Sequence, residues 1–171
     1  MESDELLEVV DYKGNVIACA PRKSIHGDPS LMHRVVHVLV INKNGDILLQ
    51  KRSQKKDVAP GKWDTSVGGH VCMGEDLLSS SKREMHEELG ITGYEPEYLY
   101  SYIHRSEFET EMVTSFYCFC ERGFSFNREE IDDLRFWSRE EIENAMGMQI
   151  LSENFEHEFR TYKGFLGNNI F

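Results

Sequence analysis

The sequence predicts an α/β (α+β) fold in which a mixed central sheet is covered by helices. Two pairs of apolar, β-rich runs are joined by short turns, which predicts hairpins. A later segment, 76–89, contains no proline or glycine and ends just before Gly90, which predicts a helix with a glycine C-cap. Because strands and helices alternate along the chain, the expected arrangement is a sheet with helices packed on its faces.

Length and composition fit one soluble domain over residues 1–171. A chain of 171 residues buries roughly 70% of its unfolded surface and needs no disulfides. No run approaches the ~18 apolar residues of a membrane span, so we expect no membrane partner. The first residues, MESDELLEVV, are acidic where a secretory signal is basic, which predicts a cytoplasmic protein.

Charge limits the classes of partner. The formal net charge is −11, which disfavours nonspecific binding to nucleic acid. An acidic chain can still bind a small phosphorylated molecule when a cation lies between the two. The cysteines form no C-x-x-C pair and are expected to be reduced thiols; Cys118 and Cys120 alternate on an expected strand, which favours buried packing over metal binding.

The first part of the chain is expected to form strands. An N-terminal hairpin is expected over about 6–20, where Gly14 tolerates the positive φ of a turn. A second hairpin is expected around Asn44-Gly45-Asp46, between two β-rich runs. After a loop with the turn signal Pro60-Gly61, a short strand is expected at 65–67.

The second part combines helices and strands. The helix at 76–89 is followed by two aromatic and β-branched strands linked around 104–109. Ser138 and Glu141 form a capping box before a short helix, and apolar residues at helical spacing predict a C-terminal helix over about 150–163.

Three glutamates share one face of the expected helix at 76–89. At about 100° per residue, Glu87 and Glu88 lie about −60° and +40° from Glu84. An apolar stripe borders these acids and is expected to dock the helix on the body of the protein; it consists of Leu78, Met85 and Leu89. The acids are therefore expected beside the packed edge of the helix.

Gathering these acids has an electrostatic cost. Two like charges about 4 Å apart repel by roughly 4 kcal/mol at an effective dielectric constant of about 20. Arg83 can offset part of this repulsion through bidentate bonds, with Glu75 as a partner. A divalent cation offsets more, and carboxylate oxygens suit Mg²⁺ or Mn²⁺. The alternative is a solvated helix face with (i, i+4) pairing, which spacing alone leaves open.

Glycines precede this helix. Gly68, Gly69 and Gly74 would let the backbone approach a ligand or metal closely. The alternative is that they serve a tight turn.

The spacing of these residues resembles the complete Nudix box of the Nudix hydrolase family. The matching positions are Gly69, Glu75, Arg83-Glu84-Met85, Glu87-Glu88 and Gly90-Ile91. The order of flanking elements extends the resemblance over a core of about 30–145. It implies an α/β/α Nudix sandwich with its Nudix helix at about 76–89. It also implies hydrolysis of a nucleoside diphosphate linked to another group, with Mg²⁺ or Mn²⁺ as cofactor.

The resemblance also implies roles for single residues. Glu84, Glu87 and Glu88 would ligate the metal, with one of them acting as general base, and Arg83 would orient them. The carbonyl of Gly68 would be a further metal ligand. The structural positions of the box would be Gly69, Glu75 and Gly90. The family is compatible with a homodimer, although no residue establishes one.

A narrower resemblance is to the isopentenyl diphosphate isomerase branch of the superfamily. It is carried by the segment LLQKRSQKKDVAPGKWDTSVGGHVCMGE, by His33 and by Glu109-Thr110-Glu111. Those isomerases carry a catalytic cysteine where this chain has Gly68, and Cys72 lies further along. Without that thiol the chain lacks an acid/base group that protonation of an alkene requires. We therefore expect an isomerase-like hydrolase; the alternatives are an isomerase and a non-catalytic nucleotide-binding module.

Further residues gain expected roles from this branch. Glu109 and Glu111 alternate along a strand edge, so they face one side and are candidates for an extra metal ligand and a base. The alternative is an acidic edge that deters aggregation. His33 and His70 resemble metal-binding histidines of the isomerases; without the cysteine we expect them to be hydrogen-bonding structural residues.

A basic cluster interrupts this acidic chain. Its members are Lys51, Arg52, Lys55, Lys56 and Lys62. We expect substrate phosphates to be held by Lys51, Arg52, Lys56 and Lys62, with solvated side chains as the alternative. Trp63 is expected to pack beneath this loop.

Overall fold

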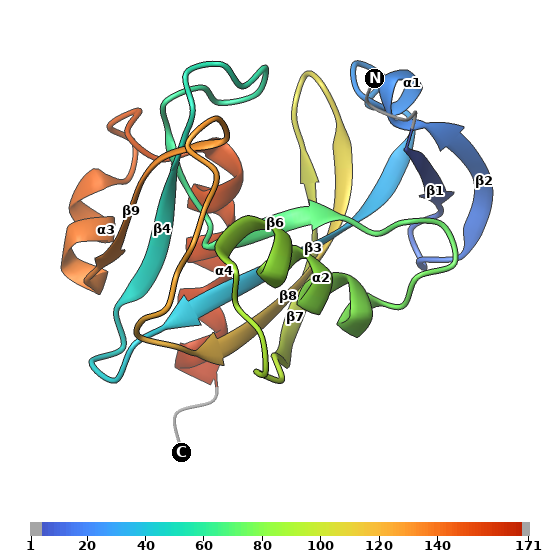
Figure 1. Cartoon of the computed structure of the whole chain (residues 1–171). Helices are drawn as coiled ribbons and strands as arrows, with labels where there is room; N and C mark the ends of the chain where they lie inside the picture. The colour runs from blue at the N-terminus through green and yellow to red at the C-terminus, as the bar shows by residue number, and fades with distance from the viewer. Residues whose placement is uncertain (1–4, 169–171) are drawn as a thin grey trace.

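The fold is a mixed sheet between two helical layers (Figure 1). The structure, a computed structural model, describes residues 5–168, so the ends 1–4 and 169–171 of the predicted domain lie outside the described residues. None of the described helices is long and apolar enough to span a bilayer.

Strand β3 (Met32–Ile41) is the centre of the sheet. It pairs in parallel with β8 (Thr110–Phe119) and antiparallel with β6 (Val67–His70) and β1 (Leu6–Val10). Strand β8 pairs antiparallel with β7 (Glu97–Arg105). Parallel and antiparallel pairs thus meet in one sheet, which confirms the predicted mixed sheet.

Further strands flank this centre. Strand β1 forms a hairpin with β2 (Val16–Pro21), which confirms the N-terminal hairpin. Strand β4 (Ile47–Arg52) pairs antiparallel with β9 (Ile131–Trp137) and with the short β5 (Trp63–Asp64).

Helices cover the two faces, with α2 (Leu77–Leu89) in front of the strands and α4 (Glu153–Asn168) behind them in Figure 1. Alternation along β3 separates two cores. One packs on α2 and includes Val36, Val38, Val40, Met85 and Leu89. The other packs on α4 and α3 (Arg139–Ala145) and includes Leu39, Ile41, Ile142, Phe155 and Phe159. The predicted α/β/α layering is therefore confirmed.

Several predicted details are wrong. The two strands around Asn44-Gly45-Asp46 exist, but they separate at once, since β3 and β4 pair only at Ile41 and Ile47. The short strand predicted at 65–67 is replaced by β5 and β6, and β9 was not predicted at all. Leu78 is 39% exposed, so it is not part of the docking stripe, whereas Met85 and Leu89 are buried as predicted.

Other local differences are small. The polar connection after β2 contains a single helical turn, α1 (Arg22–Ile25). The C-terminal helix starts at Glu153, after the predicted position 150, and continues past 163. The capping box of Ser138 and Glu141 is present at the start of α3. Cys118 and Cys120 are free thiols buried in the core, as predicted.

Candidate active site

Helix α2 is held at both ends by local interactions. Asp76 caps its N-terminus by accepting a hydrogen bond from the Ser79 amide at 2.9 Å. Gly90 ends it in the left-handed conformation, with φ of 66°, which glycine adopts without strain. The predicted helix and C-cap are confirmed, and these ends fix the rotation of the acidic face.

Arg83 is the hub of this face. It donates from Nε and Nη2 to the two oxygens of Glu75, both at 2.9 Å, which confirms the predicted bidentate pair. These bonds, helped by the Ser80 hydroxyl, hold the pKa of Glu75 at about 2. Nη1 of Arg83 donates to Glu84 at 2.6 Å and to Glu87 at 3.2 Å. Arg83 therefore orients two box acids and anchors to a third.

Glu84 is buried against the backbone of Gly69. A Cβ at position 69 would lie 2.1 Å from Cδ of Glu84, so only glycine leaves room for this carboxylate. Burial raises the pKa of Glu84, and Arg83 opposes this effect. The site therefore holds a desolvated carboxylate that gains from a nearby cation.

Glu87 and Glu88 lie in different surroundings. The Glu87 side chain is 56% exposed. Glu88 accepts a hydrogen bond from Gln50 Nε2 at 2.7 Å and from the Gly68 amide at 3.4 Å. Burial, and then the charge of Glu84, raises the pKa of Glu88 to about 8. The structure thus places Gly68 beside these acids.

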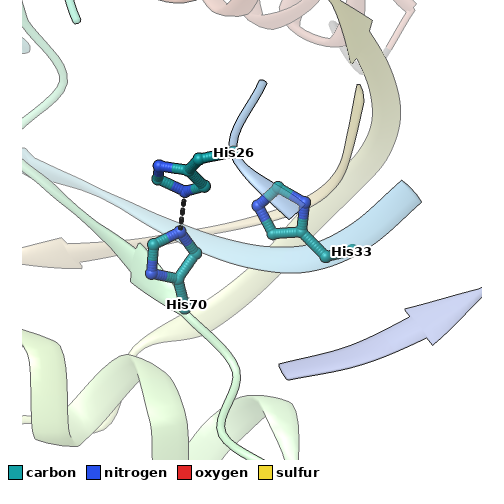
Figure 2. A group of neighbouring side chains, drawn as sticks. All are labelled: His26, His33 and His70. Carbon is teal, nitrogen blue, oxygen red and sulfur yellow. Dashed lines mark hydrogen bonds between the residues drawn. The ribbon is translucent and has the colours of Figure 1, made fainter. Parts of the chain in front are cut away.

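Three histidines from separate elements converge near this region (Figure 2). Nε2 of His26 and Nε2 of His70 are 3.2 Å apart, and each ring lies within 6 Å of the His33 ring. One nitrogen of each ring lies within 4.8 Å of one from each of the others, a grouping that can hold a metal ion.

The carboxylates predicted on the strand edge join these histidines. Glu109 lies 3.4 Å from His26 and Glu111 lies 3.9 Å from His33. Burial raises the pKa of both carboxyl groups. The charge of Glu109 raises the pKa of Glu111 further, to about 8. Both side chains are largely buried rather than forming an exposed acidic edge. The alternative of a solvated, aggregation-deterring edge is therefore wrong.

Buried His33 lacks the partners that a structural histidine would have. Neither of its ring nitrogens has a hydrogen-bond partner among the described residues. Burial and the neighbouring His70 lower the pKa of His33 to about 3, so its ring is neutral. A neutral imidazole is the form that ligates metals, so His33 can serve a metal site, while its structural role stays a prediction.

The predicted phosphate-binding cations are mostly paired within the chain. Lys56 contacts Glu130, and Lys62 donates to the carbonyl of Gln149. Arg52 donates from Nε to the Val58 carbonyl at 2.9 Å and lies 3.5 Å from Asp64. Lys55 contacts Glu129, whereas Lys51 forms no ion pair with the part of the chain that the structure describes. Trp63 is partly buried, as predicted, and packs edge-on against Trp137.

Sequence reasoning missed three residues of this region. His26 lies in a segment that was interpreted as a polar loop. Its short sequence spacing to His33 could have indicated a shared site. Asp64 contributes to the raised pKa of both Glu88 and Glu111, and accepts from Ser152 at 2.8 Å. Asn154, at the start of α4, donates to Glu111 at 2.8 Å. No local pattern marks the last two.

Comparisons with known proteins agree with this geometry. The family model of the NUDIX domain matches residues 31–158. An uncharacterized Nudix hydrolase of Yersinia pestis is 36% identical over 138 residues, which are 81% of this chain and 75% of that protein. An isopentenyl-diphosphate Delta-isomerase of Streptomyces avermitilis is 37% identical over 87 residues, 51% of this chain and 44% of that protein. The crystal structure of DR0079 from Deinococcus radiodurans has a TM-score of 0.74 at 24% identity, covers 92% of this chain and 98% of its own, and shares the fold.

The layered fold, the acidic helix and the matching family model define the class of this protein as a hydrolase. This chain belongs to the Nudix family. It is therefore a hydrolase of the pyrophosphohydrolase class that acts on a small molecule, and hydrolases of this family generally use divalent metals.

Proposed function

We propose that this chain is a Mg²⁺- or Mn²⁺-dependent enzyme that cleaves the diphosphate bond of a nucleoside diphosphate linked to another group, or of a similar small phosphorylated metabolite. The observation that supports this proposal most is the packing of the Glu84 carboxylate against Gly69, beside Arg83. A buried carboxylate next to two further acids fits a divalent cation, because the cation offsets both desolvation and repulsion.

Each box residue has a role in this proposal. Glu84, Glu87 and Glu88 would hold the metal, with the carbonyl of Gly68 beside them. The bound ion would polarise the diphosphate oxygens and neutralise the leaving phosphate. Arg83 fixes the Glu84 rotamer. Gln50 fixes the Glu88 rotamer through a hydrogen bond from its Nε2. The same Nε2 also donates to the Ser66 carbonyl at 3.0 Å.

A second cation site is proposed at the histidines. Its ligands would be His26, His33, His70, Glu109 and Glu111. Imidazole together with carboxylate suits transition metals such as Mn²⁺ or Zn²⁺ better than Mg²⁺. The side chain of Glu5 lies 3.6 Å from Nδ1 of His70 and turns Nε2 toward the cluster, as outer carboxylates do for metal-bound histidines.

Glu111 is also the proposed general base. Oε2 of Glu111 accepts a hydrogen bond from Asn154, whereas Oε1 is the oxygen that faces His33. Phosphate groups of the substrate would be held by Lys51, Arg52, Lys56 and Lys62. Lys56 can bind a phosphate only after its ion pair with Glu130 breaks. This pair is exposed to solvent, so breaking it costs little free energy. The cytoplasmic location and the homodimer stay predictions.

Hydrolysis of a substrate panel tests this function. The protein with Mg²⁺ would be incubated with nucleotide sugars, dinucleotides, nucleoside triphosphates and coenzyme A. We expect turnover of at least one class, and a loss of about 100-fold or more in Glu87→Gln, since that variant removes a proposed metal ligand at an exposed position. Glu140→Gln, an exposed acid on α3, is the matched control. The proposal fails if the wild type turns over nothing faster than Glu87→Gln.

Isomerisation of isopentenyl diphosphate is the second candidate. It is favoured by the Streptomyces relative and by the histidine cluster, and opposed by the glycine at position 68. The test is incubation with isopentenyl diphosphate in deuterated water. We expect no deuterium in the recovered substrate; incorporation catalysed by the wild type would establish the isomerase instead.

A further inference from the structure

A fully buried carboxylate on α4 holds a histidine of the central strand. Glu158 is 0% exposed, and its oxygens accept from Nδ1 of His37 and from three hydroxyls: Tyr100 at 2.8 Å, Tyr102 at 2.8 Å and Ser115 at 2.7 Å. Burial alone would raise the pKa of Glu158, but His37 and these hydroxyls lower it. The carboxylate is therefore ionised and its acceptor sites are filled.

This contact sets the orientation of the His37 ring. Burial opposes a charged imidazole, but the Glu158 carboxylate outweighs it and raises the pKa of His37. With Nδ1 committed to Glu158, the ring presents Nε2–H as its second donor. No residue in the described range 5–168 accepts a hydrogen bond from this nitrogen.

The Nε2 edge of the ring lies beside Gly68. His37 and Gly68 are directly paired between β3 and β6. A Cβ at position 68 would lie 3.1 Å from Cδ2 and 3.3 Å from Nε2 of His37. The missing side chain therefore leaves this edge of the ring uncovered.

Thr65, whose methyl group flanks the same glycine, carries a hydroxyl that is unpartnered among residues 5–168. The hydroxyl of Thr65 is buried and has no hydrogen-bond partner within the described chain. Its Cγ2 lies 3.4 Å from the Cβ position at Gly68. Buried polar atoms are nearly always paired in folded proteins, so the unpaired Thr65 hydroxyl, on a residue next to this glycine, is consistent with a ligand that supplies the missing partner.

The pair also lies on the face of the sheet that carries the histidine cluster. Alternation along β3 puts His33 and His37 on one side, and β8 places Glu111 next to His33. Asn154, one turn before Glu158 on α4, donates to Glu111 at 2.8 Å, and its Oδ1 lies 2.9 Å from the Tyr102 hydroxyl, whose single proton is shared with Glu158. Helix α4 thus connects the pair to the proposed base.

We propose that the Glu158–His37 pair is a phosphate-binding element, in which Nε2 of His37 donates a hydrogen bond to a non-bridging oxygen of the diphosphate substrate over Gly68. The inference rests on the proposed function, since it takes the substrate to be a diphosphate. A purely structural ion pair makes the opposite prediction, because its Nε2 would not respond to a diphosphate.

Nuclear magnetic resonance of the ring nitrogens tests this directly. The full chain, labelled with ¹⁵N-histidine and saturated with Mg²⁺, would be titrated with methylenediphosphonate, which cannot be hydrolysed. We expect the Nε2 signal of His37 to move with the occupancy of the ligand while its Nδ1 signal stays. A ligand that binds without moving Nε2 would overturn the inference and leave the proposed function intact.

Substitutions provide a second readout. His37→Asn keeps an amide that can donate to Glu158 but has no group at the Nε2 position. A charge-assisted hydrogen bond is worth enough that we expect the Kd for methylenediphosphonate to rise about 10- to 100-fold. Glu158→Gln keeps an acceptor but removes the charge, so the Kd should rise less. Gly164→Ala, on the same helix α4, is the control, with a change within about twofold, because a Cβ there would meet no atom within 4 Å.

The outcomes separate two failures. Hydrolysis by the wild type together with an unchanged Kd in His37→Asn overturns this inference alone. A wild type that neither hydrolyses the panel nor binds methylenediphosphonate overturns the proposed function and this inference with it. If His37→Asn does not fold, the nitrogen titration on the wild type still decides.

Discussion

Replacing Gly69 with alanine should displace the Glu84 carboxylate and strongly reduce activity while the fold survives. The added Cβ would lie 2.1 Å from Cδ of Glu84 and 2.3 and 2.4 Å from its two oxygens. Since non-bonded carbon atoms pack at about 3.5 Å, the carboxylate must move by more than about 1 Å. A misplacement of about 1 Å in a catalytic group can cost about 100-fold in rate, so we expect kcat/KM of Gly69→Ala to fall by about that factor.

Stability should change much less than activity. The clashing atoms are the end of a flexible side chain, and Gly69 has no positive φ that alanine would strain. We expect a cost of about 1 kcal/mol, which lowers the Tm of a chain of this size by about 2–4 °C. Initial rates on the best substrate of the panel and thermal unfolding measure the two effects separately.

The matched control is Gly164→Ala on α4, where a Cβ would meet no atom within 4 Å. Its rate should equal that of the wild type, and its stability should rise, because alanine favours a helix interior. If Gly69→Ala keeps the wild-type kcat/KM, the position of Glu84 does not matter to the reaction, and the proposed metal site is refuted.

Three further predictions address stability and metal binding. Glu75→Gln should lose about 1–2 kcal/mol at neutral pH, because Arg83 holds the pKa of Glu75 at about 2 rather than 4.5 and solvent screens part of this interaction. A lowered carboxyl pKa stabilises the folded state above pH 4.5, and this stabilisation is lost as the pH falls toward about 2. The difference in unfolding free energy between wild type and Glu75→Gln, measured with urea, should therefore shrink over that pH range. A difference that stays constant would contradict the Arg83–Glu75 pairing. Phe155→Ala should cost about 3–5 kcal/mol in the same assay, since the ring is 0% exposed, and a loss below about 1 kcal/mol would contradict the packing on α4. Mn²⁺ added after chelator treatment should raise Tm through binding to the folded state, and less so in His33→Gln; an equal rise in both would exclude the histidine cluster as a metal site.

The elements that the sequence predicts well are those with local signals. Helix α2 has a capping aspartate, an apolar stripe and a terminal glycine within one short segment. The acids of the box were found for the same reason, since three of the four lie within two turns of that helix and their spacing alone puts them on one face.

The pairing of the strands could not be predicted from local sequence signals. The segment around Asn44-Gly45-Asp46 has the local chemistry of a hairpin, yet β3 takes β8 as its long partner, residue 32 pairing with residue 110. Such a choice depends on which strands can share a buried face, and this is decided by residues far apart in the sequence. Strand β9 has the sequence IDDLRFW, with two adjacent charges that break the alternation typical of a strand, and only its pairing with β4 shows it to be one.

His26, the grouping of the three histidines and the Glu158–His37 pair were missed for a related reason, whereas His33 and His70 were singled out by the resemblance alone. His26, His33 and His70 come from a turn, a central strand and a short strand. Glu158 is an acid within a charged helix, and only the packing of α4 on β3 shows that it is buried. Sites assembled from several elements have no periodicity to reveal them, whereas the box is contained in one loop and one helix.

Titration of the protein with Mg²⁺ tests the central claim most directly, with backbone amide resonances followed by ¹H–¹⁵N spectroscopy. Mg²⁺ prefers oxygen ligands, so it reports on the acids of α2 rather than on the histidines. We predict saturable shifts confined to residues 68–69 and 83–88, which disappear in a Glu84→Gln and Glu87→Gln double variant. Unshifted resonances over these residues, or shifts that persist in the double variant, would contradict the claim that this helix holds the catalytic cation.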